Sequence, residues 1–234
     1  MNAHICGHVE DSYNKVAQEF ATQVFNELQY KPLDRELLNR FAVRVKDIGL
    51  TCDIGCGPGQ VARYLWEQGV RVCGLDLSAA MVEQARRLSP GIEFTTGNML
   101  ALDVASDSWA GITAFNSIIH LPRNEVAQAL REFWRVLLPG GLLLLAFHLG
   151  DHTLHVEEWW GIPVDLEFNH FRSPEVADYL RLAGFEVEAI FERPPYPDVE
   201  RPTERAYVVA RKPKSSASNQ LQMIPPPPGK DDRQ

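Results

Sequence analysis

Residues Leu50–Asp76 read LTCDIGCGPGQVARYLWEQGVRVCGLD. This stretch begins with a short apolar run that ends at Asp53, and a turn with three glycines follows. Apolar residues then recur at helical spacing until Gly69, and Val70–Leu75 reads as a second strand. A strand, a glycine turn, a helix and a second strand make the βαβ unit of a nucleotide-binding sheet. The stretch therefore predicts an α/β fold with a ligand at the glycine turn.

The spacing of the glycines indicates which kind of nucleotide binds. Gly55, Gly57 and Gly59 depart from the dinucleotide fingerprint G-x-G-x-x-G, because Gln60 stands where the third glycine belongs. Asp53, at the tip of the first strand, would repel a pyrophosphate and suits a cationic ligand that has no phosphate. S-adenosylmethionine is such a ligand, since it carries a sulfonium and an amino group. We therefore expect S-adenosylmethionine as the cofactor.

Asp76 is the second carboxylate of the stretch, at the tip of the second strand. A carboxylate in this position can accept hydrogen bonds from both ribose hydroxyls. We interpret Asp53 and the backbone of the three glycines as the site of the amino-acid end of the cofactor, and Asp76 as the site of its ribose.

The sequence at this point resembles the class I S-adenosylmethionine-dependent methyltransferases. Asp53–Gly59 (DIGCGPG) is similar to the first motif of that family, and Gly74–Ser78 (GLDLS), followed by Met81, is similar to the second. The resemblance extends over about Tyr13–Lys212. It implies a single doubly wound, mostly parallel seven-stranded sheet with helices on both faces and an antiparallel last strand. It also implies that Leu77 and Met81 contribute to the cofactor site.

The same resemblance implies further cofactor contacts. Family members usually carry Asp where this chain has Asn98, and the amide oxygen of Asn98 can still accept a hydrogen bond from the adenine amino group. The backbone N–H of Met99 would then meet the ring. Tyr13 lies in the leading helices, which cover the cofactor in this family, so it either contacts the methionine end or packs in the core. For Lys31 the alternatives are the cofactor carboxylate and a solvated position.

The loop after the fourth predicted strand should face the reacting methyl group. In open α/β sheets the ligand lies outside the carboxyl ends of the strands, and this loop runs from Asn116 to Pro122. It lacks the Asn/Asp-Pro-Pro-aromatic quartet of methyltransferases that act on nucleobase amino groups or on glutamine. We place Asn116 at the cofactor and His120 as the candidate catalytic base. His148, after the fifth strand, is the second catalytic candidate, and the alternative for both histidines is a structural role.

The chain divides into one domain with two flanking segments. We expect a flexible N-terminus over residues 1–10, a cofactor-binding domain over 11–212 and a disordered tail over 213–234, rich in Ser, Asn, Gln and Pro. Within the domain, residues 11–46 form the leading helices. Residues 148–172 form a lid-like insertion with aromatic side chains beside charges. Five histidines lie in the loop after the fourth strand or in the insertion: His120, His148, His152, His155 and His170. They share no helix face, so we expect no metal site.

Composition excludes several classes of partner. The net charge of −8 over 234 residues argues against a nucleic-acid partner. No apolar run approaches the length of a membrane span, and no secretory signal is evident, so we expect a cytoplasmic protein without a membrane partner. Four cysteines in or beside expected core strands and turns fit a reducing compartment. Oligomeric state is open.

These observations together predict a methyltransferase that moves a methyl group from S-adenosylmethionine to an oxygen or nitrogen of a small molecule. Three alternatives stay open at this point. They are a nicotinamide-dependent oxidoreductase, which Asp53 and Gln60 disfavour, a non-catalytic S-adenosylmethionine-binding protein, and a protein methyltransferase.

Overall fold

The structure, a computed structural model, describes residues 3–214, with side chains from Gly7 onward. The predicted tail over 213–234 therefore lies outside the described residues except for its first two positions. The helices are α1 (Ala3–Val24), α2 (Pro32–Val45), α3 (Gln60–Glu67), α4 (Ala79–Leu88), α5 (Arg123–Val136) and α6 (Ser173–Leu182), with the 3-10 helices η1 (Glu27–Tyr30) and η2 (Ile118–His120). The strands are β1 (Thr51–Ile54), β2 (Val72–Asp76), β3 (Glu93–Thr96), β4 (Trp109–Phe115), β5 (Leu137–His148), β6 (Thr153–Trp159), β7 (Ile162–Asn169), β8 (Glu186–Arg193) and β9 (Arg205–Arg211).

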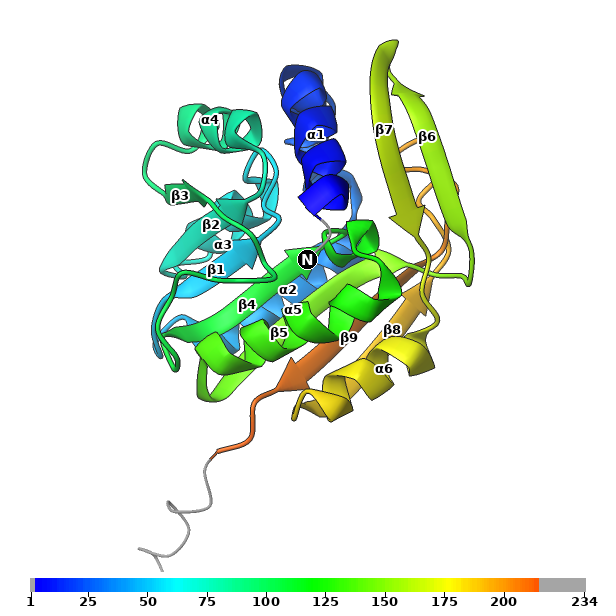
Figure 1. Cartoon of the computed structure of the whole chain (residues 1–234). Helices are drawn as coiled ribbons and strands as arrows, with labels where there is room; N and C mark the ends of the chain where they lie inside the picture. Colours follow the sequence, from blue (N-terminus) through cyan, green and yellow to red (C-terminus); the bar gives the residue numbers. More distant parts are fainter. Residues whose placement is uncertain (1–2, 215–234) are drawn as a thin grey trace, which may run out of the picture.

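Seven strands form one sheet in the order β3-β2-β1-β4-β5-β9-β8 (Figure 1). The pairs from β3 through β5 are parallel, whereas β9 is antiparallel to both of its neighbours. The predicted fold, a mostly parallel seven-stranded sheet with an antiparallel last strand, is confirmed. The chain order reverses between β1 and β4, and ligands bind outside the carboxyl ends of the strands at such a switch point.

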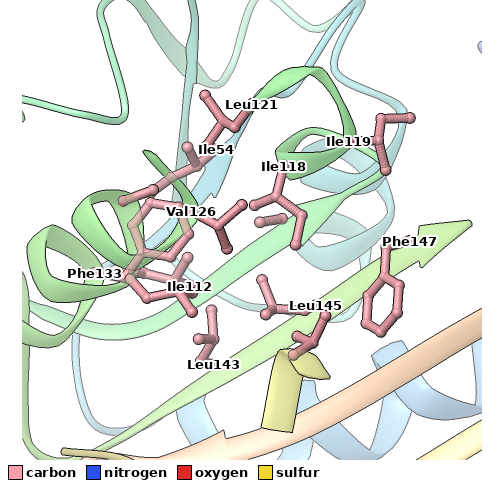
Figure 2. Close-up of a cluster of buried hydrophobic side chains, with 14 of the residues drawn as sticks. Ile54, Ile112, Ile118, Ile119, Leu121, Val126, Phe133, Leu143, Leu145 and Phe147 are labelled. Atoms are coloured by element: carbon pink, nitrogen blue, oxygen red, sulfur yellow. The ribbon is translucent and has the colours of Figure 1, made fainter. Parts of the chain in front are cut away.

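Apolar side chains cover both faces of the sheet. Along β5, Leu143 and Leu145 belong to one buried cluster, and Leu142 and Leu144 belong to the other. Figure 2 shows part of the first cluster, in which Phe133 of α5 packs over the strands. The second cluster includes residues of α2 and α3. A strand that buries both faces is apolar throughout, which is why this run is readable from the sequence.

Two segments differ from the sequence-based expectation. The first helix begins at Ala3, so residues 3–10 continue α1 and do not form a separate N-terminal segment ahead of Asp11. The expected insertion over 148–172 contains a two-stranded antiparallel ribbon, β6–β7, which the sequence analysis did not predict. In Figure 1, α1 (blue) stands between α4 and this ribbon, above the carboxyl edge of the parallel strands. Within residues 3–214, no helix has both the length and the apolar character of a membrane span.

A buried ionic cluster joins α2 to the last two strands. Arg193 Nη2 donates to Asp34 Oδ2 at 3.0 Å, and the Tyr207 hydroxyl donates to the same oxygen at 2.8 Å. Arg193 Nη1 also pairs with Glu200. The side chains of Asp34, Arg193 and Glu200 are all less than a tenth exposed. Removing one partner from a buried ion pair leaves an uncompensated charge, which is costly.

We therefore expect Arg193→Met to destabilise the fold by about 3–5 kcal/mol, because Asp34 and Glu200 would lose a buried counter-charge. The measurement is the free energy of unfolding in urea. Arg181→Met is the matched control, since Arg181 is exposed and pairs with Asp178 three residues away. Equal unfolding midpoints for the two variants would contradict the structural role of the cluster.

Candidate active site

A cavity of about 600 Å³ opens at the carboxyl ends of the parallel strands. Its floor comes from the segments that follow β1, β2 and β4, and its walls come from α1 and the β6–β7 ribbon. This volume lies within the range of small-molecule sites. Of the residues that the sequence singled out, the cavity is lined by Tyr13, Gly55, Gly57, Asp76, Leu77, Asn98, Met99, Asn116, His120 and His148.

Asp76 is fixed at the floor of the cavity by two backbone amides. Its Oδ2 accepts from Gly57 N at 2.8 Å, and its Oδ1 accepts from Ser78 N at 2.9 Å. Burial raises the pKa of this carboxyl group, and the amide donors oppose the rise. A Cβ at Gly55 would lie 2.3 Å from the Cβ of Ser117, and the φ of Gly55 is +69°, so this position requires glycine. The Asp76 carboxylate is therefore held in one orientation beside the glycine turn that follows β1.

Asp53 is not among the residues that line the cavity, and its role at the cofactor stays a prediction. The side chain is 2% exposed. Its Oδ1 accepts from Thr113 Oγ1 at 2.7 Å, and its Oδ2 accepts from Ala62 N at 3.2 Å. Burial raises the pKa of Asp53 to about 7. Asp53 therefore acts from below the site, where it ties β1 to β4 and to the first turn of α3.

Gly59 and Met81 also lie outside the cavity lining, and their assignment to the cofactor site stays a prediction. Gly59 has a φ of +87°, and a Cβ there would lie 2.8 Å from the Phe94 ring, so this glycine serves close packing. Met81 is 1% exposed within the apolar core, and its N–H donates to the Ser78 hydroxyl that caps α4. Met81 is therefore a residue of the hydrophobic core.

The floor of the cavity also presents polar side chains. Asn98 Oδ1 accepts from Leu100 N at 2.9 Å, which orients the amide. Asn116 has a φ of +52°. Within the described chain, the buried oxygens Gln60 Oε1, Asn116 Oδ1 and Ser117 Oγ have no hydrogen-bond partner. Buried polar atoms normally have partners, so these lining residues fit a polar ligand such as the cofactor.

Tyr13 and His120 form a hydrogen-bonded pair across the cavity. The Tyr13 hydroxyl lies 2.7 Å from His120 Nε2, and His120 Nδ1 lies 2.9 Å from the carbonyl oxygen of Glu167. Because a carbonyl only accepts, Nδ1 carries the proton and Nε2 accepts from the tyrosine. Burial lowers the pKa of His120 to about 4 and raises that of Tyr13. The histidine is thus neutral near pH 7, with its basic nitrogen directed at α1.

His148 occupies a different environment. Its Nδ1 lies 3.0 Å from the Thr203 hydroxyl, which also accepts from Arg205. Because an arginine only donates, the hydroxyl proton is available to Nδ1 of His148. Burial lowers the pKa of His148 to about 2, and the charge of Arg205 adds to this effect. His148 is therefore a neutral side chain that is poorly suited to accept a proton.

Aromatic rings form the wall opposite the floor. Trp159 and Phe168 of the β6–β7 ribbon pack edge to face at 5.8 Å between ring centroids. Phe20 of α1 packs against Trp159 at 5.4 Å. Sequence reasoning placed aromatic residues of the insertion near the substrate but missed Phe20 and Arg201, which also line the cavity. No local motif marks either residue, since each is brought to the site by tertiary packing.

Two expectations concern charged and metal-binding groups. Lys31 lines the cavity but is buried, with its Nζ 2.7 Å from Glu27 and 3.3 Å from Glu200. The solvated position, which was one of the two alternatives for Lys31, is therefore wrong. Over residues 3–214, no three His, Cys, Asp or Glu side chains gather in a way that could hold a metal ion. The rings of His152 and His170 instead stack at 4.1 Å.

Comparison with known proteins agrees with this geometry. Residues 52–141 match the family model described as a methyltransferase domain. The chain is 30% identical over 157 residues to a malonyl-[acyl-carrier protein] O-methyltransferase of Enterobacter lignolyticus, a match that covers 67% of this chain and 61% of the relative. It is 39% identical over 145 residues to a 2-phytyl-1,4-naphtoquinone methyltransferase of Thermosynechococcus vestitus, covering 55% of this chain and 60% of the relative. The chain thus matches less than two thirds of the length of either relative.

The fold matches solved structures over almost the whole chain. Magnesium protoporphyrin IX methyltransferase from Synechocystis, solved with bound SAM, superposes with a TM-score of 0.68. The match covers 91% of this chain and all of the other, at 17% sequence identity. This chain carries a methyltransferase domain of the class I, S-adenosylmethionine-dependent family.

The state of His120 can be measured directly. We expect its imidazole to stay neutral, with the proton on Nδ1, from pH 8 down to pH 5, because the folded pKa is about 4. Below pH 6.5, the ordinary pKa of histidine, His120 binds a proton in the unfolded chain but not in the folded chain. His120 therefore lowers the free energy of unfolding as the pH falls toward 4. Nitrogen-15 NMR of the imidazole ring reports both properties, and His120→Gln assigns the signal. A midpoint near 6.5, or a proton on Nε2, would refute this description of the site.

Proposed function

We propose that the protein transfers a methyl group from S-adenosylmethionine to an oxygen or nitrogen of a small molecule. The proposal depends on one observation. The Asp76 carboxylate, which accepts hydrogen bonds from two backbone amides, lines the same cavity as the neutral Tyr13–His120 pair. The first group suits a nucleoside and the second suits an acceptor that must lose a proton. The named relatives are methyltransferases, which supports the same reading.

The residues of the floor would hold the cofactor. Asp76 would accept hydrogen bonds from the ribose hydroxyls, and Asn98 and Met99 would meet the adenine. The backbone of Gly55 and Gly57, which lines the cavity, would hold the amino-acid end. When bound, the cofactor supplies a methyl group on a positively charged sulfur that leaves readily. The protein then has to orient the acceptor, exclude water and remove one proton.

His120 is the residue that we assign to the proton. Its Nε2 is an acceptor in the structure, and the Nδ1–H bond to the Glu167 carbonyl would stabilise the imidazolium that forms. A pKa of about 4 makes it a weak base toward a free hydroxyl. An acceptor atom becomes much more acidic as it gains the methyl group, so a weak, positioned base suffices at that stage. Tyr13 holds Nε2 in place until the acceptor arrives. His148 stays a second candidate only as a hydrogen-bond donor.

The roof of the cavity favours a small acceptor over a folded protein. Helix α1 and the β6–β7 ribbon both stand over the carboxyl edge of the sheet (Figure 1). We keep the lid role of residues 148–172, the cytoplasmic location and the lack of a nucleic-acid partner as predictions.

The test is an untargeted search for metabolites that gain fourteen mass units when incubated with the pure protein and S-adenosylmethionine. Production of one such metabolite, together with S-adenosylhomocysteine, is the expected result. A protein that binds S-adenosylhomocysteine but releases no methyl group to any extract would instead be a non-catalytic binding protein. Binding of NAD in preference to S-adenosylhomocysteine would support the oxidoreductase alternative.

Asp76→Ala should weaken the binding of S-adenosylhomocysteine more than tenfold, because the ribose loses its acceptor and the Gly57 amide loses its partner. Isothermal titration calorimetry gives the dissociation constants. Asp103→Ala is the matched control, since Asp103 is an exposed carboxylate away from the cavity, and it should bind like the wild type. Unchanged affinity in Asp76→Ala would remove the ribose assignment.

His120→Ala and Tyr13→Phe separate catalysis from binding. Once an acceptor is known, His120→Ala should lower turnover by about a hundredfold, the usual contribution of a general base. Tyr13→Phe should have a smaller effect, because it leaves Nε2 free to accept. Both variants should bind S-adenosylhomocysteine within about twofold of the wild type. If affinity in His120→Ala falls and turnover at saturation does not, His120 is a cofactor contact and not a base.

A further inference from the structure

We propose that Arg201 forms an anion-binding subsite at the acceptor end of the cavity, and that the acceptor carries a carboxylate there. This inference rests on the proposed function, which it deepens by naming a class of substrate. Arg201 lies in the loop between β8 and β9 and lines the same cavity as Tyr13 and His120.

The guanidinium of Arg201 is held by aromatic rings. Its central carbon lies 5.1 Å from the ring centroid of Trp159 and 5.1 Å from that of Phe168. Cation–π contacts with the two rings hold the positive charge of the guanidinium at the wall of the cavity. Among the described residues, no carboxylate lies within ion-pair distance of Arg201. It is a half-buried cation without a protein counter-charge.

The neighbouring buried cations are all paired, so Arg201 stands out. Lys31 pairs with Glu27 and Glu200, and Arg193 pairs with Asp34 and Glu200. Arg205 faces Glu200 as well. Glu200 precedes Arg201 in the chain, yet it is directed into this network and also accepts from Tyr196 N. The network has three cations and three anions, so it has no negative charge left for Arg201.

The location of Arg201 points to the acceptor and not to the cofactor. Its partners Trp159 and Phe168 belong to the aromatic wall, and Phe168 also packs on His120 at 4.9 Å. The positive charge acts on the Tyr13 hydroxyl, whose pKa it lowers against the effect of burial. The glycine turn and Asp76, which would hold the cofactor, are on the floor. An anion on Arg201 would therefore place its carrier against the rings, beside His120.

A carboxylate matches this subsite best. One free guanidinium compensates one negative charge, and its planar fork forms two parallel hydrogen bonds with a carboxylate. A phosphate monoester carries a charge of nearly −2 at pH 7, and exposed Asp198 also lines the cavity, which would disfavour a second negative charge. The rings of Trp159 and Phe168 offer an apolar surface for the rest of the molecule.

Paired probes test this subsite without knowledge of the true acceptor. The probes are benzoate with benzamide, cinnamate with cinnamamide, and phenyl phosphate, each titrated into protein saturated with S-adenosylhomocysteine and followed by calorimetry or ligand-observed NMR. The proteins are the wild type, Arg201→Gln and the control Arg172→Gln, whose arginine is exposed and pairs with Asp151. We expect wild type and control to bind each carboxylate at least tenfold more tightly than its amide, and Arg201→Gln to lose that preference.

Several results would overturn the inference. Equal binding of carboxylates and amides to the wild type, no binding of either, or a preference that persists in Arg201→Gln would each do so. Tighter binding of phenyl phosphate than of the carboxylates would mean that the subsite binds a phosphate and not a carboxylate. If Arg201→Gln instead weakens S-adenosylhomocysteine tenfold or more, Arg201 holds the carboxylate of the cofactor. Each of these outcomes leaves the proposed function intact, whereas failure of the wild type to bind S-adenosylhomocysteine contradicts the proposed function itself.

Discussion

The hydrogen bonds from Gly57 N and Ser78 N to the Asp76 carboxylate are the interaction on which the site depends. They join the turn after β1 to the start of α4 and hold one negative charge at the end of β2, one strand away from the β1–β4 pair where the chain order of the sheet reverses. The two amide donors keep the carboxylate oriented before any ligand arrives. Preorganisation of this kind means that a nucleoside meets a ready acceptor, so little binding energy goes into ordering the protein.

The sequence predicts the sheet well because burial on both faces leaves a continuous apolar run, as in β5. It predicts the positions of the two strand-end acids equally well but not their different roles. Asp53 and Asp76 each follow an apolar run, and only the packing shows that Asp53 is enclosed by Thr113 and Ala62. Burial of a side chain is a tertiary property, so a motif places such a residue without showing whether it reaches the ligand.

The acceptor end was the least predictable part of the molecule. The Tyr13–His120 hydrogen bond joins residues 107 positions apart, and Arg201 reaches the ring of Trp159 from a different loop. The β6–β7 ribbon, which brings Trp159 and Phe168 to the cavity, interrupts the simple alternation of strand and helix. Such contacts depend on how loops are placed around a common sheet, and the same fold supports many acceptors for this reason. The charge and aromatic content of the loops indicated a binding region, but not which side chains would meet.

The most direct measurement of the central claim is a crystal structure of the protein with S-adenosylhomocysteine. We expect the ribose hydroxyls to lie within hydrogen-bond distance of the Asp76 carboxylate and the sulfur to face the Tyr13–His120 pair. The aromatic wall and Arg201 should then enclose the remaining space. A nucleoside bound outside this cavity, or a ribose turned away from Asp76, would contradict the account.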